Sequence, residues 1–172
     1  MATQEKKKIQ HAAYPRQMLE KIVIDAGIGR ASQLPHFEEK GLIQIKRDLS
    51  LIAGQAPQER KARLSIAGFK VRQGQIVGLR ITLRRRKMVD FLERLIRIVL
   101  PRVRDFSGIP LTAVDKGGAL NIGFREQFVF PEVEAEQSPL SFSFGVSVVP
   151  KTRDRDKALL WYREYGVPLK KK

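Results

Sequence analysis

The chain has 172 residues, the length of one domain, and 42% of them are hydrophobic, so its composition excludes a disordered protein. The formal net charge of +15 favours a polyanionic partner such as nucleic acid over a small substrate. The absence of cysteine excludes disulfides, thiolate nucleophiles and cysteine-based metal sites.

A basic membrane-surface protein is the competing interpretation of this charge. Such proteins usually carry a basic amphipathic helix or a lipidation signal, and we find neither in the sequence. There is no run of about 18 apolar residues, and the start, Met-Ala-Thr-Gln-Glu-Lys-Lys-Lys, lacks the apolar core of a signal peptide. We therefore expect a protein that works away from membranes.

The first third of the chain predicts a tail, a strand and a helix. Residues 1–19 are polar and basic, and we expect a tail that orders on a partner, with a merely solvated terminus as the alternative. Lys21–Asp25 is typical of a short strand. The spacing of Leu42, Ile45, Leu49 and Ile52 predicts a helix over about 35–53, ended by a left-handed residue at Gly54.

Most of the excess charge lies in residues 58–104, which hold 14 Lys and Arg residues against 3 Asp and Glu residues. Within them, residues 68–74 form a basic loop between glycines. The next segment predicts a half-buried strand, because the apolar Leu79, Ile81 and Leu83 alternate with Arg80, Thr82 and Arg84. A second amphipathic helix follows, which we expect to stop before Pro101, and residues 101–120 are typical of a loop.

The last third predicts two more strands and a helix. The strands carry Ile122, Phe124, Phe128 and Phe130 in the first, and Phe142, Phe144, Val146 and Val148 in the second. An acidic loop, residues 131–139, separates them. We expect Thr152 to cap a final helix over about 153–165 and residues 170–172 to form a basic tail.

These elements predict a single α+β domain over residues 20–169. Its sheet is rich in antiparallel strands, helices pack on one face, and the other face is open and polar. The polar side of the alternation carries Asp25, Arg80, Thr82, Arg84, Arg125, Gln127 and the serines at 141, 143 and 147. Such a face suits the sugar-phosphate surface of folded RNA, although many antiparallel sheets simply expose one face to water.

Several collinear motifs carry a resemblance to a known family. They include Glu20–Gly29, Ile52–Pro57, Lys61–Gly74, Val77–Arg84, Leu100–Gly108, Asn121–Glu132 and the pair Lys151 and Thr152. The chain resembles the universal large-subunit ribosomal protein L-five family, which binds 5S rRNA, in its bacterial form. The resemblance runs from about Tyr14 to Leu169 and implies a non-enzymatic ribosomal protein of the cytoplasm or of an organelle, with no cofactor and no metal.

The resemblance also implies where the partners bind. In similar proteins the polar sheet face docks on 5S rRNA, and here it would use Gln55 and Thr82, with Asp25, Arg80, Arg84 and Arg125 nearby. The protein would help to attach 5S rRNA to the large-subunit rRNA at the central protuberance, beside neighbouring large-subunit proteins. The loop with Gly68, Phe69, Lys70, Arg72 and Gly74 would approach the peptidyl-site tRNA. A small-subunit head protein would be contacted near Phe106, Gly108, Pro131, Glu132 and Glu134.

Two departures from the family pattern bear on these expectations. The family usually begins with a longer N-terminal segment that contains a helix, and this chain has about twenty residues before the first strand. Asp25 stands where the family has Asn. Because an ionised Asp only accepts hydrogen bonds, we expect its carboxylate to pair with Arg80, Arg84 or the amides of residues 27–29, or to accept from a ribose hydroxyl or a base amino group.

Other signals in the sequence are weaker. A nucleotide-dependent enzyme that uses Gly27 and Gly29 is the rival function from another class. These two glycines lack the third glycine of a dinucleotide-binding fingerprint and favour a turn instead. His11 and His36 have no partner at metal-ligand spacing. Glu132, Glu134 and Glu136 are typical of a solvated or partner-facing patch. Phe69 could stack on a base or anchor its own loop, and a free nucleic-acid chaperone is the rival within the same class.

Overall fold

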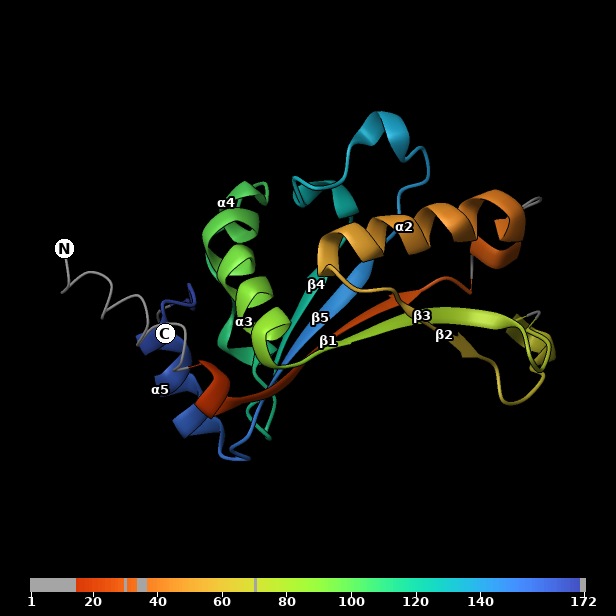
Figure 1. The fold of residues 1–172 in the computed structure, drawn as a ribbon. Helices are drawn as coiled ribbons and strands as arrows, with labels where there is room; N and C mark the ends of the chain where they lie inside the picture. The colour runs from red at the N-terminus through yellow and green to blue at the C-terminus, as the bar shows by residue number, and fades with distance from the viewer. Residues whose placement is uncertain (1–14, 30, 34–36, 70, 171–172) are drawn as a thin grey trace. The chain divides into compact units, whose positions relative to one another are not determined.

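Five antiparallel strands form one sheet in the computed structural model, which describes residues 15–29, 31–33, 37–69 and 71–170 (Figure 1). The strands are β1 (Leu19–Gly27), β2 (Gln58–Lys61), β3 (Ile76–Leu83), β4 (Leu120–Phe124) and β5 (Phe144–Pro150). They lie in the order β2-β3-β1-β5-β4. With the helices described below, this arrangement confirms the predicted α+β class.

Alternating side chains give the strands a buried side. Leu79, Ile81 and Leu83 of β3 are buried, whereas Arg80 is exposed and Thr82 is half-buried, as the alternation predicts. In β5 the buried residues are Phe144, Val146, Val148 and Pro150. The apolar rows of these strands therefore supply much of the core, and the polar rows remain available for contacts outside it.

The chain forms two compact units, and several strands contribute to both. The described residues of unit 1 are 15–23, 82–122 and 147–170, and those of unit 2 are 24–29, 31–33, 37–69, 71–81 and 123–146. Our expectation of a single domain over residues 20–169 stays a prediction. The tails that we expected at residues 1–19 and 170–172 lie mostly outside the described residues, while residues 15–18 form a helical turn before β1.

Unit 2 contains the predicted first helix. A π-helical turn, Phe37–Gly41, leads into α2 (Leu42–Ala53), and the predicted start near residue 35 lies outside the described residues. Leu42, Ile45, Leu49 and Ile52 are buried along one side of α2. Gly54 ends the helix in the left-handed conformation, with φ of 63°, and its N–H donates to the Ser50 carbonyl, as the sequence predicts.

The strand predicted through Phe128 and Phe130 ends earlier than expected. β4 stops at Phe124, and a 3₁₀ turn, Gln127–Val129, follows it. The reason lies in Gln127, which we expected on the open polar face and which is fully buried. Its side chain donates to the Leu140 carbonyl at 2.9 Å and accepts from the Phe142 N–H at 3.1 Å. This side chain satisfies the backbone of residues 140–142 in place of a strand, while Phe124, Phe130 and Phe144 still pack their rings together.

The second predicted helix lies in unit 1 and does not stop before Pro101. It comprises α3 (Arg85–Arg94), a π-helical turn (Leu95–Val99) and α4 (Leu100–Arg102), so that Pro101 lies inside it. At the π turn the Leu100 N–H donates to the Leu95 carbonyl, five residues back. Because proline lacks an N–H and its ring crowds the carbonyl four residues earlier, a wider turn just before it lets the helix continue.

The last helix of unit 1 is α5 (Arg155–Tyr165), and its cap differs from the prediction. Asp154, not Thr152, is the N-cap residue: its carboxylate accepts from the N–H groups of Asp156 and Lys157. The Thr152 hydroxyl instead accepts from the Asp154 N–H at 3.2 Å. Gly166 ends α5 with φ of 94°, and the side chains of Trp161 and Tyr162 are buried.

No helix in the described residues is long and apolar enough to cross a membrane.

Candidate nucleic-acid interface

An ion pair on the polar side of the strands defines the centre of the candidate interface in unit 2. Arg80 Nε of β3 lies 2.5 Å from Asp25 Oδ1 of β1, and the two side chains are 43% and 45% exposed. The structure therefore confirms the expectation that Asp25 pairs within the protein. Because only Nε of the guanidinium is used in this hydrogen bond, the Nη groups of Arg80 keep N–H donors for an outside acceptor.

Strand β2 brings two more polar side chains to the same face. In its antiparallel pairing with β3, Gln58 lies opposite Arg80 and Arg60 lies opposite Gly78. Residues directly opposite each other in such a pair point to the same side of the sheet. Gly78 contributes no side chain beside Arg60. The surface formed by Asp25, Gln58, Arg60 and Arg80 is called the unit 2 polar face below.

Gln58 and Arg60 were not among the sequence-predicted site residues. The segment Gln58-Glu59-Arg60-Lys61 contains no apolar residue, so the alternation that reveals a half-buried strand is absent from it. The signal that the sequence offered was the concentrated positive charge of residues 58–104. This charge identifies a basic segment but does not tell which face of the sheet its side chains occupy.

A second ion pair fixes β2 to α2. Lys46 Nζ lies 2.5 Å from Glu59 Oε1, and this hydrogen bond, with the charges of Lys46 and Lys61, lowers the pKa of the Glu59 carboxyl. The carboxylate of Glu59, which lies between Gln58 and Arg60 in the chain, is therefore paired with Lys46 of the same unit. The predicted contact residue Gln55 lies half-buried in the connection between α2 and β2.

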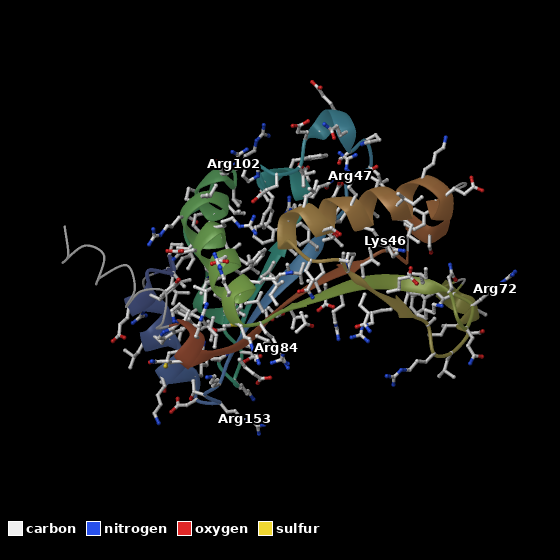
Figure 2. All side chains as sticks on the ribbon, in the orientation of Figure 1. Lys46, Arg47, Arg72, Arg84, Arg102 and Arg153 are labelled. Atoms are coloured by element: carbon white, nitrogen blue, oxygen red, sulfur yellow. The ribbon has the colours of Figure 1, made fainter. Side chains whose placement is uncertain are left out.

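The remaining residues predicted to bind 5S rRNA have separate positions. Thr82 and Arg84 belong to unit 1, where Thr82 is half-buried and Arg84 is exposed. Arg84 Nη1 donates to the Glu20 carbonyl at 3.3 Å and lies 3.7 Å from the Glu20 carboxylate (Figure 2). Arg125 is an exposed residue of unit 2 directly after β4.

The basic loop of unit 2, residues 62–75, has its own hydrogen-bonded framework. Ile66 and Val71 pair as an antiparallel bridge, the Gly74 N–H donates to the Ala62 carbonyl, and the Gln73 N–H donates to the Ser65 hydroxyl. Gly74 has a φ of 84°, as expected for a glycine that closes the loop. Gly68, the other glycine of the loop, does not adopt a positive φ and lies in a 3₁₀ turn, Ala67–Phe69.

The tip of this loop exposes apolar and basic side chains together. Phe69 is 71% exposed, and Leu64 and Ile66 are also exposed. Figure 2 shows Arg72 at the far end of the loop, away from α2. Lys70 lies outside the described residues. Phe69 therefore does not pack into the core of unit 2.

The residues predicted to contact the small subunit are divided between the units. Pro131, Glu132 and Glu134 belong to unit 2, in an acidic loop that hydrogen bonds anchor to α2: the buried Ser138 hydroxyl donates to Asp48 Oδ1 at 2.8 Å, and Gln44 Nε2 donates to the Leu140 carbonyl at 2.9 Å. Phe106 and Gly108 belong to unit 1. There the Ile109 N–H donates to the Pro168 carbonyl at 2.7 Å.

The described residues were also compared with what a metal site and a nucleotide-binding turn require. They contain no group of three His, Asp or Glu side chains arranged to hold a metal. Gly27 is the last residue of β1, and the Ile28 N–H continues the contact with β3 by donating to the Val77 carbonyl. The chain turns at Gly29, after which the Ser32 N–H donates to the Ile28 carbonyl. The predicted turn therefore includes Gly29, whereas Gly27 belongs to the strand.

Comparison with known proteins identifies the family. The ribosomal protein L5 model matches residues 16–72, and the model of the C-terminus of the same ribosomal family matches residues 76–169. The chain is 41% identical over 155 residues to large ribosomal subunit protein uL5 of Fusobacterium nucleatum, covering 89% of this chain and 81% of that protein. It is 40% identical over 154 residues to uL5 of Chlorobaculum tepidum, covering 90% and 82%. The chain therefore belongs to the ribosomal protein L5 family.

Proposed function

We propose that this chain is a non-enzymatic, structural constituent of the large ribosomal subunit, and that it binds 5S rRNA through the unit 2 polar face and residues adjoining it. The supporting observation is the exposed pairing of Arg80 with Asp25 beside Arg60 on β2. The ion pair holds the Arg80 guanidinium over the strands, while its remaining donors can reach phosphate oxygens. Arginine suits this task because its planar fork matches the geometry of phosphate.

Charge and shape together explain why folded RNA is the proposed partner. A-form RNA presents phosphates and ribose hydroxyls on a broad surface, and proteins recognise it mainly through these groups. Gln58, Gln55 and Thr82 can exchange hydrogen bonds with ribose hydroxyls, and Arg60, Arg80, Arg84 and Arg125 can neutralise phosphates. We place the protein in the ribosome of a bacterial-type cytoplasm, in contact with large-subunit rRNA and neighbouring ribosomal proteins.

Two further contacts belong to the same proposal. The tip of the loop at residues 62–75, with Gly68, Phe69, Lys70, Arg72 and Gly74, approaches the peptidyl-site tRNA. Its support is the combination of an exposed aromatic ring with flanking cations, which suits stacking and phosphate contact. The acidic loop with Pro131, Glu132 and Glu134, and the segment with Phe106 and Gly108, contact a protein of the small-subunit head. The support for the acidic loop is its exposed Glu134, held near Gln137 by a hydrogen bond of 2.6 Å.

Direct binding of the full chain to 5S rRNA over a range of salt concentrations tests the 5S assignment. Replacing Arg60 and Arg80 together with Ala should reduce the steepness of the plot of log K against log salt concentration by about one unit per lost phosphate contact. The double variant Arg86→Ala, Arg163→Ala removes the same charge from α3 and α5 and is the matched control.

The two rival functions predict different outcomes. A free RNA chaperone would bind unrelated RNA as tightly as 5S rRNA and would not sediment with large subunits. A nucleotide-dependent enzyme would bind a mononucleotide saturably. Equal salt slopes for the Arg60 and Arg80 variant and for the unsubstituted chain would contradict the assignment of the unit 2 polar face.

A further inference from the structure

A basic cavity in unit 1 is not accounted for by the unit 2 polar face. Its volume is about 410 Å³, and four cationic side chains line it: Arg16, Arg84, Arg85 and Lys151. Among the described residues of the lining, Glu20 is the one carboxylate, and the buried Leu19 and Met88 also belong to it. Four positive groups against one negative group leave an excess that a bound anion would neutralise.

Hydrogen bonds bring these cations together from three segments of unit 1, which contain Arg16, the consecutive Arg84 and Arg85, and Lys151. The Lys151 N–H donates to the Met18 carbonyl at 2.8 Å, and Lys151 Nζ donates to the Arg16 carbonyl at 3.0 Å. Arg84 Nη1 donates to the Glu20 carbonyl at 3.3 Å. The Glu20 carboxylate is shared, because Lys21 Nζ lies closer to it, at 3.2 Å, than Arg84 does at 3.7 Å. Glu20 therefore neutralises little of the charge in the lining.

The start of α3 adds backbone donors to the same place. Arg84 is the N-cap residue of α3 and makes no side-chain capping hydrogen bond, and the first turn contains no acidic residue. The N–H groups at a helix start favour an anion, yet this turn carries Arg85, Arg86 and Lys87. These cationic side chains and the positive end of the helix dipole repel each other, and a bound anion would relieve this repulsion.

We propose that this cavity binds a phosphodiester group of an RNA backbone, as a second RNA contact carried by unit 1. The inference rests on the proposed function, since it assigns a further part of the chain to rRNA. The cavity is many times larger than the roughly 30 Å³ occupied by one water molecule, so a phosphate with its attached ribose can enter it.

The test uses the full chain and two double variants with equal loss of charge. Arg85→Gly with Lys151→Gln removes two cations of the cavity. Glycine is chosen because Arg85 has a φ of 54°, which glycine adopts without strain, and glutamine keeps a donor for the Arg16 carbonyl. The control is Arg153→Gln with Arg163→Gln, two exposed residues outside both the cavity lining and the first turn of α3.

Binding to 5S rRNA and to an unrelated RNA duplex is measured from low to moderate salt. We expect the cavity variant to lose about one to two units of salt slope, since one or two phosphate contacts disappear, and the control to stay close to the unsubstituted chain. In parallel, inorganic phosphate is titrated at low salt, and the backbone amide resonances of residues 85–88 are followed by NMR. They should shift in the unsubstituted chain and not in the cavity variant.

The possible results separate this inference from the proposed function. If the unsubstituted chain binds RNA and the cavity variant keeps its salt slope, the inference is overturned, even where inorganic phosphate shifts the amides, because the cavity then takes only a free anion. Equal losses in the cavity variant and in the control also overturn it. A chain that binds neither RNA overturns both proposals. Loss of salt slope confined to the cavity variant supports the inference.

Discussion

At the scale of single residues, Asp25 shows how a carboxylate can lie on the surface that we propose binds RNA. Its Oδ1 atom accepts from Arg80 Nε, so the negative charge serves to orient a guanidinium and is not left facing phosphates. The pair is about half exposed, and such surface ion pairs typically contribute less than about 1 kcal/mol. The ion pair therefore matters for the orientation of the Arg80 guanidinium more than for the stability of the fold.

Replacing Asp25 with Asn should change the binding free energy for 5S rRNA by less than about 1 kcal/mol, the span of a single net hydrogen bond. The amide oxygen of Asn can still accept from Arg80, and the lost charge leaves Arg80 freer to bind phosphate. The measurement is the dissociation constant at a fixed salt concentration, with Asp115→Asn in unit 1 as the control. A gain of several kcal/mol would mean that Asp25 repels the RNA and that the pairing argument is wrong.

Gln127 has an influence on the fold that its size does not suggest. Gln127→Ala would leave the buried Phe142 N–H without its partner, while the Leu140 carbonyl would keep the hydrogen bond from Gln44. We expect the free energy of unfolding to fall by about 1–3 kcal/mol, the cost of one orphaned buried group. Chemical denaturation measures the loss. Gln137→Ala, on an exposed residue of the same loop, should cost far less, and similar losses for the two variants would contradict this role.

At the scale of elements, the start of α5 depends on one carboxylate. The N–H group of Lys157 is the largest cause that lowers the pKa of Asp154, with the N–H of Asp156 and the charge of Lys157 acting in the same direction. A lowered pKa in the folded state means that the stabilisation is complete above the unfolded pKa of about 3.8. It is lost as the pH falls through the lower folded value.

We therefore expect Asp154→Ala to lower the melting temperature by a few degrees at pH 7 and to have little effect at strongly acidic pH, where the cap is protonated in both states. Thermal unfolding followed by the fluorescence of Trp161, the one tryptophan of the chain, reports on this unit. Asp156→Ala removes the same charge from the first turn without removing the cap. If both variants behave alike, charge and not capping explains the effect.

The basic loop supports a prediction that separates its role from the unit 2 polar face. Lys70→Glu with Arg72→Glu should leave folding and 5S rRNA binding unchanged, because the hydrogen bonds that frame the loop use backbone groups, Ser65 and Gln75. The same double variant should reduce the occupancy of tRNA in the peptidyl site of reconstituted ribosomes, since two repulsive charges would face its phosphates. Lys116→Glu with Arg153→Glu is the charge-matched control. Loss of 5S binding instead would place the loop in the docking surface.

At the scale of the whole molecule, a net charge of +15 should make folding and RNA binding respond to salt in opposite directions. Screening reduces repulsion among the cations, so the free protein should gain stability as NaCl rises from about 10 mM to about 300 mM. Over the same range 5S rRNA binding should weaken steeply, because counterions compete for the phosphates. Denaturant melts and binding isotherms at matched salt concentrations measure both trends, and parallel trends would argue against phosphate contacts as the main source of affinity.

Much of the fold followed from alternation and helical spacing, and the errors have physical causes. The core positions of α2, β3 and β5 were predictable because apolar residues recur there at the period of the element. The end of β4 was not, since it depends on a contact between Gln127 and a backbone segment 13 residues away. The helix passing through Pro101 was missed because a π turn can accommodate proline, and sequence spacing does not reveal such a turn.

The candidate interface was predictable only in part. The pairing of Asp25 with Arg80 could be expected because both follow the polar phase of their strands. The positions of Gln58 and Arg60 could not be predicted, because a strand without apolar residues shows no alternation that would tell which side chains face the core. The cavity of unit 1 combines Arg16, Arg84, Arg85 and Lys151 from distant parts of the chain, and no spacing in the sequence joins them.

Strand β2 has a consequence for the protein before it meets any RNA. As an outer strand it exposes unpaired backbone groups, and such edges invite other chains to add a strand and start an aggregate. β2 is only four residues long, entirely polar, and carries Arg60 and Lys61, while its register shifts between them. A second copy approaching this edge would meet like charges and an irregular ladder. The cationic residues that suit β2 to bind a polyanion therefore also oppose aggregation of newly made copies through this edge.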